Sequence, residues 1–406
     1  MKHNPAPASP KRKPSVPPPP KTLPYAPTHR ITPPSSVLEP LTRADIEIFN
    51  NLRGSHKLAK KRKRIDIEVD DEGDGDNRQR KRSKDVSLIA GHYNARPDVG
   101  AKQRLQSPII GLKAFNNWIK AVLIGKFAHP ALRDSPWSNG GKVLDLGCGK
   151  GGDLTKWAKA AVAEYIGLDI AAVSIEQARS RHAQMHNASR FPAFFAALDC
   201  YTHPISTVVP AEILSPPPRR PQDRPNDGPD VFDVVSMQFC MHYAFESETK
   251  ARTMLDNVSR YLRRGGMFIG TIPNADLMLQ RLLSLPPDAA PRFGNSVYTI
   301  EFDDRRPKDQ RPVFGDRYSF FLTDAVEDVP EYVVVWEPFV RLAKEYNLHP
   351  VYRKEFHEVF QENQEDKEFG PLMVRMKVVD QNGESHMNED QWEAANIYIA
   401  FAFEKR

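Results

Sequence analysis

The apolar positions of the chain predict one leading helix followed by alternating strands and helices. Between residues 108 and 130 apolar side chains recur at helical spacing, and a proline closes that segment. The elements expected next are a strand ending at Leu146, a helix over 153–162, a strand ending at Asp169, a helix over 171–186 and a strand ending at Asp199. This alternation predicts an α/β fold with a doubly wound, mostly parallel sheet.

The second half of the pattern completes this sheet and adds two insertions. Residues 215–230 hold too many prolines for a regular element, so we expect a loop insertion over about 213–230. Strand-like runs at 296–302 and 318–322 predict a small late lid over about 276–335. The other expected elements are a strand over 232–239, a helix over 249–262, a turn at Gly265-Gly266, a strand over 267–273 and a final strand over 397–403.

The first 85 residues differ in composition from the rest and are expected to be a disordered tail, which leaves one folded domain over 86–406. Residues 1–84 carry 19 Lys and Arg against 10 Asp and Glu, which is +9 in a chain of net charge +5 and leaves the remainder at −4. Two basic clusters, 60–64 and 78–84, resemble a bipartite nuclear-import signal, with a solvated basic linker as the alternative. We therefore expect a nuclear protein.

Other features of the sequence exclude whole classes of protein. The Pro-rich N-terminus has no apolar core of a signal peptide, and no apolar run approaches the ~20 residues of a membrane span, so we expect a soluble protein. Only Cys148, Cys200 and Cys240 occur, far apart in sequence, which argues against a disulfide framework and against a zinc site. A mildly acidic domain also argues against a long groove that tracks many RNA phosphates.

A glycine-rich turn after the first strand indicates a nucleotide-like ligand. The motif Gly147-x-Gly149-x-x-Gly152 satisfies a dinucleotide fingerprint, with Asp169 about twenty residues further on. The same residues also follow an acidic strand end, Asp145, which a dinucleotide fold does not need. Three successive strand-end carboxylates (Asp145, Asp169 and Asp199) match the ammonium, ribose diol and adenine amine of S-adenosylmethionine, and would lie where open α/β sheets bind ligands. The alternative is that these aspartates only cap helices or form turns.

Several separate motifs together resemble the eukaryotic, fungal-type mRNA cap guanine-N7 methyltransferases, from about Leu88 to the C-terminus. These motifs are HYN at 92–94, FNNWIK at 115–120, LDLGCGKGGD at 144–153, QFCMHYAF at 238–245, TIPN at 271–274, EY at 331–332 and IY at 397–398. The resemblance implies the fold of the class I S-adenosylmethionine-dependent methyltransferases, with S-adenosylmethionine as methyl donor, no metal, and the capped 5′ end of mRNA as acceptor.

The resemblance also implies the residues of the site. The methyl donor would be bound by Lys120, Gly147, Asp169, Asp199, Gln238 and Tyr243. The cap would be bound by Asn116, Asn117, Lys150, Lys156, Arg181, His242, Pro273, Glu331 and Tyr398. Within the second set, the lysines and the arginine would face the cap's phosphates or ribose, and the last four residues would enclose the guanine. Each also has an ordinary structural interpretation, such as a half-buried strand residue for Tyr398 or a packed neutral histidine for His242.

The chemistry of this reaction is consistent with the residues present. Guanine N7 carries an unprotonated lone pair, so no general acid or base is expected, and orientation with electrostatics should supply the rate. Two other functions remain open from the sequence: a methyltransferase for a small molecule or protein, and a non-catalytic RNA-binding module. Family precedent favours a monomer, and the Pro-rich basic tail is compatible with binding of the capping guanylyltransferase or the RNA polymerase tail.

Overall fold

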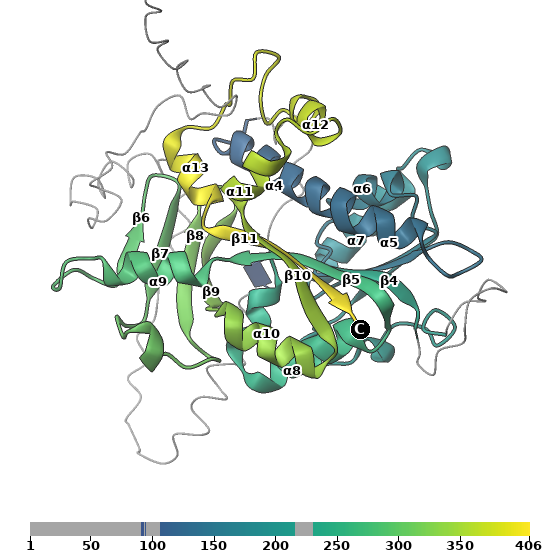
Figure 1. Cartoon of the computed structure of the whole chain (residues 1–406), viewed down its shortest axis with the longest axis horizontal. Coiled ribbons are helices and arrows are strands. Elements are labelled where there is room, and N and C mark those ends of the chain that lie inside the picture. The colour runs from purple at the N-terminus through teal and green to yellow at the C-terminus, as the bar shows by residue number, and fades with distance from the viewer. Residues whose placement is uncertain (1–90, 93, 95–105, 216–229) are drawn as a thin grey trace, which may run out of the picture.

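The computed structural model describes residues 91–92, 94, 106–215 and 230–406 (Figure 1). The expected tail with its two basic clusters and most of the expected loop insertion lie outside these residues. Within the described part of the chain, no helix is long and apolar enough to cross a bilayer.

A seven-stranded sheet with the order β10-β11-β5-β4-β1-β2-β3 forms the centre of the fold. Neighbouring strands from β3 to β5 pair in parallel, whereas β11 is antiparallel to both of its neighbours. The strands are β1 (Lys142–Leu146), β2 (Glu164–Asp169), β3 (Ala193–Ala197), β4 (Phe232–Gln238), β5 (Leu262–Pro273), β10 (Leu348–Glu355) and β11 (Tyr398–Lys405). The predicted α/β fold with a mostly parallel sheet is confirmed.

Helices cover both faces of this sheet because successive side chains of a strand point to opposite sides. Val143 and Val234 pack among α5, α6 and α7 on one face, whereas Leu144 and Val235 pack among α8 and α10 on the other. These helices are α5 (His129–Arg133), α6 (Leu154–Lys159), α7 (Ala172–Ala183), α8 (Glu248–Ser259) and α10 (Trp336–Glu345). The sheet is therefore doubly wound, as the alternating pattern predicted.

A second, four-stranded antiparallel sheet with the order β6-β7-β8-β9 lies beside the first (Figure 1). Its strands are β6 (Arg292–Gly294), β7 (Tyr298–Phe302), β8 (Arg317–Leu322) and β9 (Val326–Tyr332). Strands β7 and β8 coincide with the two strand-like runs expected from the sequence, whereas β6 and β9 were not anticipated. Glu331 of β9 pairs directly with Tyr318 of β8.

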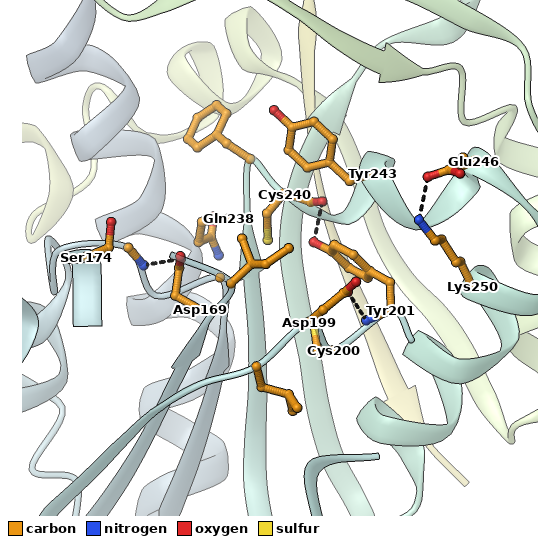
Figure 2. Close-up of a pocket in the computed structure, with 15 residues that line it drawn as sticks. Asp169, Ser174, Asp199, Cys200, Tyr201, Gln238, Cys240, Tyr243, Glu246 and Lys250 are labelled. Atoms are coloured by element: carbon orange, nitrogen blue, oxygen red, sulfur yellow. Dashed lines mark hydrogen bonds and ion pairs between the residues drawn. The ribbon is translucent and has the colours of Figure 1, made fainter. Parts of the chain in front are cut away.

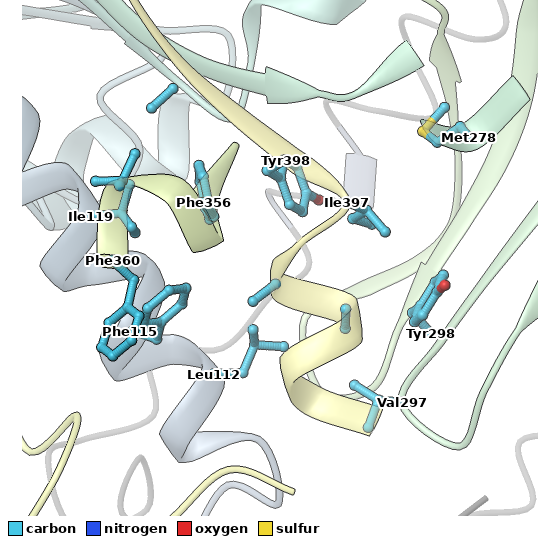
Figure 3. Close-up of a cluster of buried hydrophobic side chains, with 14 of the residues drawn as sticks. Leu112, Phe115, Ile119, Met278, Val297, Tyr298, Phe356, Phe360, Ile397 and Tyr398 are labelled. Atoms are coloured by element: carbon cyan, nitrogen blue, oxygen red, sulfur yellow. The ribbon is translucent and has the colours of Figure 1, made fainter. Parts of the chain in front are cut away.

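The leading helix α4 (Ile110–Leu123) packs against helices from the far end of the chain. Figure 3 shows Phe115 and Ile119 of α4 beside Phe356 and Phe360 of α11. The Phe115 ring centroid lies 6.3 Å from that of Phe356, and the indole of Trp118 donates a hydrogen bond of 3.0 Å to the carbonyl of Phe369. The other helices of this region are α9 (Ala275–Leu283), α11 (Phe356–Asn363), α12 (Phe369–Arg375) and α13 (Glu389–Ala395).

One expected element takes a different form. The turn predicted at Gly265-Gly266 lies inside β5, where the register against β4 shifts between Phe232 and Val234. Gly265 has φ +70°, a conformation open to glycine, so the chain bulges without ending the strand. The prediction of a separating turn was therefore wrong, because the same glycine that suits a turn also suits a bulge.

Candidate active site

The glycine turn after β1 is shaped by positive backbone φ angles. Gly147, Gly149 and Gly151 have φ values of +73°, +53° and +71°, a region that side chains with a Cβ rarely adopt. A Cβ on Gly147 would lie 2.5 Å from Cys240 Sγ, whereas a Cβ on Gly149 would meet no atom within 4 Å. The turn is therefore packed against β4 at its start and faces open space in its middle.

That open space is a cleft at the carboxyl ends of β1, β2 and β4 (Figure 2). It encloses about 960 Å³, counting the part open to solvent, which is room for a nucleoside-sized ligand. Its lining includes five of the six residues expected to bind the methyl donor: Gly147, Asp169, Asp199, Gln238 and Tyr243. Apolar side chains of Ile170, Leu198 and Phe239 complete its walls.

Polar atoms in the cleft are only partly satisfied by the protein. Asp169 accepts backbone hydrogen bonds from Gly149 (2.9 Å) and Ala171 (2.8 Å), and burial raises the pKa of its carboxyl against the effect of these two donors. Asp199 accepts one from Tyr201 N–H at 3.0 Å. The Oε1 of Gln238 is buried and has no hydrogen-bond partner among the described residues. Because buried acceptors normally accept a hydrogen bond, the unpaired Oε1 of Gln238 indicates that a bound ligand donates a hydrogen bond in this cleft.

Asp145 was expected to face the methyl donor, but it lies elsewhere. Its carboxyl is buried beneath the turn, accepts hydrogen bonds from Tyr165 Oη (2.8 Å) and Trp157 Nε1 (3.4 Å), and does not line the cleft. Burial, with the negative charge of Asp153 added, raises the pKa of Asp145 to about 7. The prediction that three strand-end carboxylates all face one ligand was therefore wrong. Asp145 lies within β1, and its side chain points to the face of the sheet that α5, α6 and α7 cover.

Lys120, the sixth residue expected to bind the methyl donor, does not line the cleft and forms an ion pair with Asp153. Lys120 Nζ is 2.7 Å from Asp153 Oδ2, and Lys156 Nζ is 2.6 Å from Asp153 Oδ1. Burial alone would raise the pKa of Asp153, but the two ammonium groups lower it well below its usual value. Lys156 also donates to Asn117 Oδ1 on α4. One carboxylate thus holds together residues expected to bind two different ligands.

Glu331 lies in a buried polar cluster between the two sheets. Its Oε2 accepts a hydrogen bond of 2.7 Å from Tyr318 Oη, and its Oε1 lies 3.4 Å from Tyr243 Oη and 3.3 Å from His242 Nε2. His242 is not aligned for a hydrogen bond to Glu331, and both its ring nitrogens are buried without a hydrogen-bond partner among the described residues. Since Tyr243 lines the cleft, this cluster adjoins the cleft directly.

Phe239 provides a second connection between the cleft and the expected guanine wall. It has φ +60°, which is rare for an aromatic residue, and its N–H donates to Thr271 Oγ1 at 3.0 Å. Its ring lies edge-on to the ring of Tyr398, with centroids 5.0 Å apart. Tyr398 in turn pairs across strands with Pro273. Two residues expected to enclose guanine are therefore adjacent to a wall of the cleft.

The remaining expected cap residues lie on three elements around the glycine turn. Lys150 belongs to the turn itself, Arg181 to α7, and Asn116 to α4. Asn116 Oδ1 is buried with no hydrogen-bond partner among the described residues. No group of residues suited to hold a metal ion occurs in the described part of the chain.

Sequence reasoning missed several residues of this region. Tyr201, whose Oη donates to the carbonyl of Cys240 at 2.7 Å, lines the cleft with Ser174, Glu246 and Lys250 (Figure 2). Tyr318 and Asp153 contact expected site residues from outside the cleft. Asp153 lay within a quoted motif, but its ion pair with Lys120 depends on the distant helix α4, whereas its other partner, Lys156, lies on the adjoining helix α6. Nothing in the local pattern distinguishes Tyr318 from any other inward-facing strand residue.

The fold and the cleft define the class of protein: the sheet order with one antiparallel strand, together with a glycine turn beneath a cleft at the strand ends, is that of the class I S-adenosylmethionine-dependent methyltransferases. A profile of the mRNA (guanine-N(7))-methyltransferase domain matches residues 76–406, and the chain belongs to this family. The predicted family is thereby confirmed.

Curated relatives agree with this assignment. The chain is 55% identical over 324 residues to the mRNA cap guanine-N(7) methyltransferase of Cryptococcus neoformans, covering 80% of this chain and 48% of that protein. It is 49% identical to the mRNA cap guanine-N(7) methyltransferase of Schizosaccharomyces pombe, covering 79% of this chain and 82% of that protein. The matched region thus spans about half of the first relative and most of the second. Among solved structures, an S-adenosylmethionine-dependent methyltransferase from Clostridium acetobutylicum is 14% identical with a TM-score of 0.38, over 80% of this chain and 98% of that one.

Proposed function

We propose that this chain transfers a methyl group from S-adenosylmethionine to N7 of the guanosine cap at the 5′ end of mRNA. The observation that carries the proposal is a set of buried polar atoms to which the described residues make no hydrogen bond. Gln238 Oε1, both ring nitrogens of His242 and Asn116 Oδ1 are buried and lack hydrogen-bond partners among the described residues. All three residues belong to the expected donor or cap sites, and buried polar atoms without protein partners indicate bound ligands.

The cleft suits the methyl donor by its chemistry. Asp169 and Asp199 offer carboxylate oxygens for a ribose diol and an adenine amine, and Gln238 offers an unpaired acceptor. Ile170, Leu198 and Phe239 offer apolar surface for the base. When bound, S-adenosylmethionine supplies an electrophilic methyl group on a sulfonium. Lys120, which is held by Asp153 and does not line the cleft, would supply a cation for the donor's carboxylate.

The Glu331 cluster suits the Watson–Crick edge of guanine. A carboxylate accepts from the N1 and N2 donors of guanine, and His242 can donate to O6, which separates guanine from adenine. Tyr398 and Pro273 provide an apolar wall for the base. Methylation leaves a positive charge on guanine, so a buried carboxylate favours both the transition state and the product. No proton has to be removed, and the protein's task is to hold N7 in line with the methyl group.

The positive groups around the glycine turn complete the proposal. Lys150, Lys156 and Arg181 would face the cap's phosphates or ribose, and Asn116 and Asn117 would contact the cap from α4. Lys156 is 8% exposed and already bonded to Asp153 and Asn117, so we assign it only its remaining ammonium donor.

Methyl transfer to defined acceptors tests this function. We would measure transfer from labelled S-adenosylmethionine to GpppG-capped RNA, uncapped RNA and RNA with an already N7-methylated cap. Glu331→Gln should lower kcat/KM for the unmethylated cap at least tenfold, because a buried charge-assisted hydrogen bond contributes about 1.5–3 kcal/mol. Glu393→Gln is the control, since Glu393 is also bonded to a buried tyrosine, Tyr298, but does not line the cleft; this variant breaks the Arg281–Glu393 ion pair as well.

Two results of this test would replace the proposal. Transfer to a protein or small molecule but not to capped RNA would support a different acceptor on the same fold. Tight binding of S-adenosylhomocysteine or capped RNA without transfer to any acceptor would support a non-catalytic binding module.

We also propose a nuclear location and action as a monomer, with the tail as the binding site for the capping guanylyltransferase or the RNA polymerase tail. The basic clusters 60–64 and 78–84 support import, and both lie outside the described residues. A fluorescent fusion with both clusters changed to alanine should lose nuclear accumulation. Retained accumulation would overturn the role of the clusters, and sedimentation of the full chain would test the monomer.

A further inference from the structure

Tyr318 makes the best-formed hydrogen bond to the Glu331 carboxylate. Tyr318 is 1% exposed and Glu331 3% exposed, and the two residues are direct cross-strand partners on β8 and β9. The bond from Tyr318 Oη to Glu331 Oε2 is 2.7 Å long, well within the range of O–H···O bonds. Burial, with the charge of Glu331 added, raises the pKa of Tyr318, so this hydroxyl remains a donor.

The contacts of the other carboxylate oxygen are weaker. Oε1 of Glu331 lies 3.4 Å from Tyr243 Oη, beyond the usual 2.5–3.0 Å range, and 3.3 Å from a His242 nitrogen that is not aligned with it. A buried carboxylate needs good hydrogen bonds to offset its lost hydration. The carboxylate is therefore fixed on the β8 side and incompletely satisfied on the side of Tyr243, where the cleft lies.

We infer that Tyr318 is a positioning residue that fixes the plane of the Glu331 carboxylate and thereby sets discrimination for the 2-amino group of the acceptor base. This inference rests on the proposed function. Tyr318 occupies one lone pair of Oε2 within this cross-strand pair, and the longer contacts of Oε1 leave the carboxylate with acceptor capacity for donors on the base. Without the hydroxyl, the carboxylate can rotate, and its contact with a second donor on the base weakens.

The test compares two acceptors that differ by one donor. RNA capped with inosine keeps N1–H but lacks the 2-amino group of guanosine. The kcat/KM for the guanosine cap divided by that for the inosine cap therefore measures how much the carboxylate's contact with the 2-amino group contributes. Tyr318→Phe should lower this ratio at least fivefold, mainly through a higher KM for the guanosine cap. Its affinity for S-adenosylhomocysteine, measured by titration calorimetry, should stay within twofold of the unchanged protein.

A second buried tyrosine of the same sheet provides a control. Tyr298 lies on the neighbouring strand β7, is fully buried, and donates from Oη to the Glu393 carboxylate at 3.3 Å. Tyr298→Phe therefore removes a longer buried tyrosine–carboxylate contact, together with the acceptor of an Arg281 hydrogen bond, from the same sheet without touching Glu331. It should leave the ratio for the two caps unchanged, even where it lowers thermal stability as much as Tyr318→Phe does.

Three outcomes decide between the explanations. A lower ratio in Tyr318→Phe alone supports positioning. An equal loss of activity toward both caps, or a lower ratio in both tyrosine variants, overturns it and assigns Tyr318 a purely structural role. Failure of the proposed function is a separate result, because the unchanged protein would then methylate neither cap while still binding S-adenosylhomocysteine.

Discussion

Replacing Asp153 with asparagine should strongly destabilise the fold. Asp153 is the shared partner of Lys120 and Lys156, and the side chains of the three residues are 12%, 17% and 9% exposed. Removing one member of a buried ion pair typically costs about 3–5 kcal/mol because a buried charge is left unpaired. Asp153→Asn leaves two neighbouring ammonium groups without their carboxylate, so we expect a loss of about 3–5 kcal/mol in the free energy of unfolding.

A double-mutant cycle measured by urea unfolding at pH 7 checks this reasoning. Adding Lys156→Met to Asp153→Asn removes one of the unpaired cations, so the double variant should be more stable than the sum of the single changes predicts, by at least about 1 kcal/mol. Glu248→Gln breaks the Arg252–Glu248 pair, whose side chains are 39% and 58% exposed, and should cost less than about 1 kcal/mol.

The pH dependence gives a further check with a defined sign. Because the pKa of Asp153 is lowered in the folded protein, its contribution is present above the unfolded value of 3.8 and is lost as the pH falls through the folded value. The difference between the unchanged protein and Asp153→Asn should therefore shrink below pH 4. Strict additivity in the cycle, or a variant that unfolds within about 1 kcal/mol of the unchanged protein at pH 7, would refute the buried-pair argument.

Three other variants test other parts of the site and its support. Asp145 has its pKa raised to about 7, so its favourable contribution is lost as the pH rises from about 4 to 7; unfolding curves of Asp145→Asn should show a flatter pH dependence over that range than the unchanged protein. Gly147→Ala places a Cβ 2.5 Å from Cys240 Sγ at φ +73°, and calorimetry should show at least tenfold weaker binding of S-adenosylhomocysteine. Phe115→Ala empties a fully buried site beneath α11 and should lower the free energy of unfolding by about 3–5 kcal/mol in urea.

The sequence predicted the parts of the fold that depend on local pattern. The strands β1, β2 and β4 are mostly apolar, and glycine or acidic residues lie at or near their ends. Strand β10 was missed because Leu348–Glu355 mixes apolar, proline and charged residues. It is held as an edge strand by β11, the last element of the chain, and such a long-range partner cannot be read from a local window.

The candidate site was predictable to the extent that its residues lie at strand ends. Asp169 and Gln238 end their strands, Gly147 and Asp199 follow theirs, and all four residues line one cleft. Asp145 follows the same pattern but points to the opposite side, because a shift of one residue along a strand reverses the side-chain direction. The direction of a side chain at the end of a strand depends on where the strand stops, and that boundary is the least certain part of a sequence-based prediction.

The corner between β4 and η5 (Met241–Glu246) joins the cleft to the residues proposed to bind the cap. Phe239 and Tyr243 both line the cleft, yet Phe239 also contacts Tyr398, and Tyr243 also lies beside Glu331. The left-handed backbone of Phe239 is of a kind that costs about 1–3 kcal/mol, and Thr271 Oγ1 helps to hold it there. In the proposed function the reaction needs only the alignment of two bound groups, and backbone strain at a corner shared by the cleft and the proposed cap site would serve that alignment. Because only four peptide units separate Phe239 from Tyr243, a change at this corner should affect both sites together.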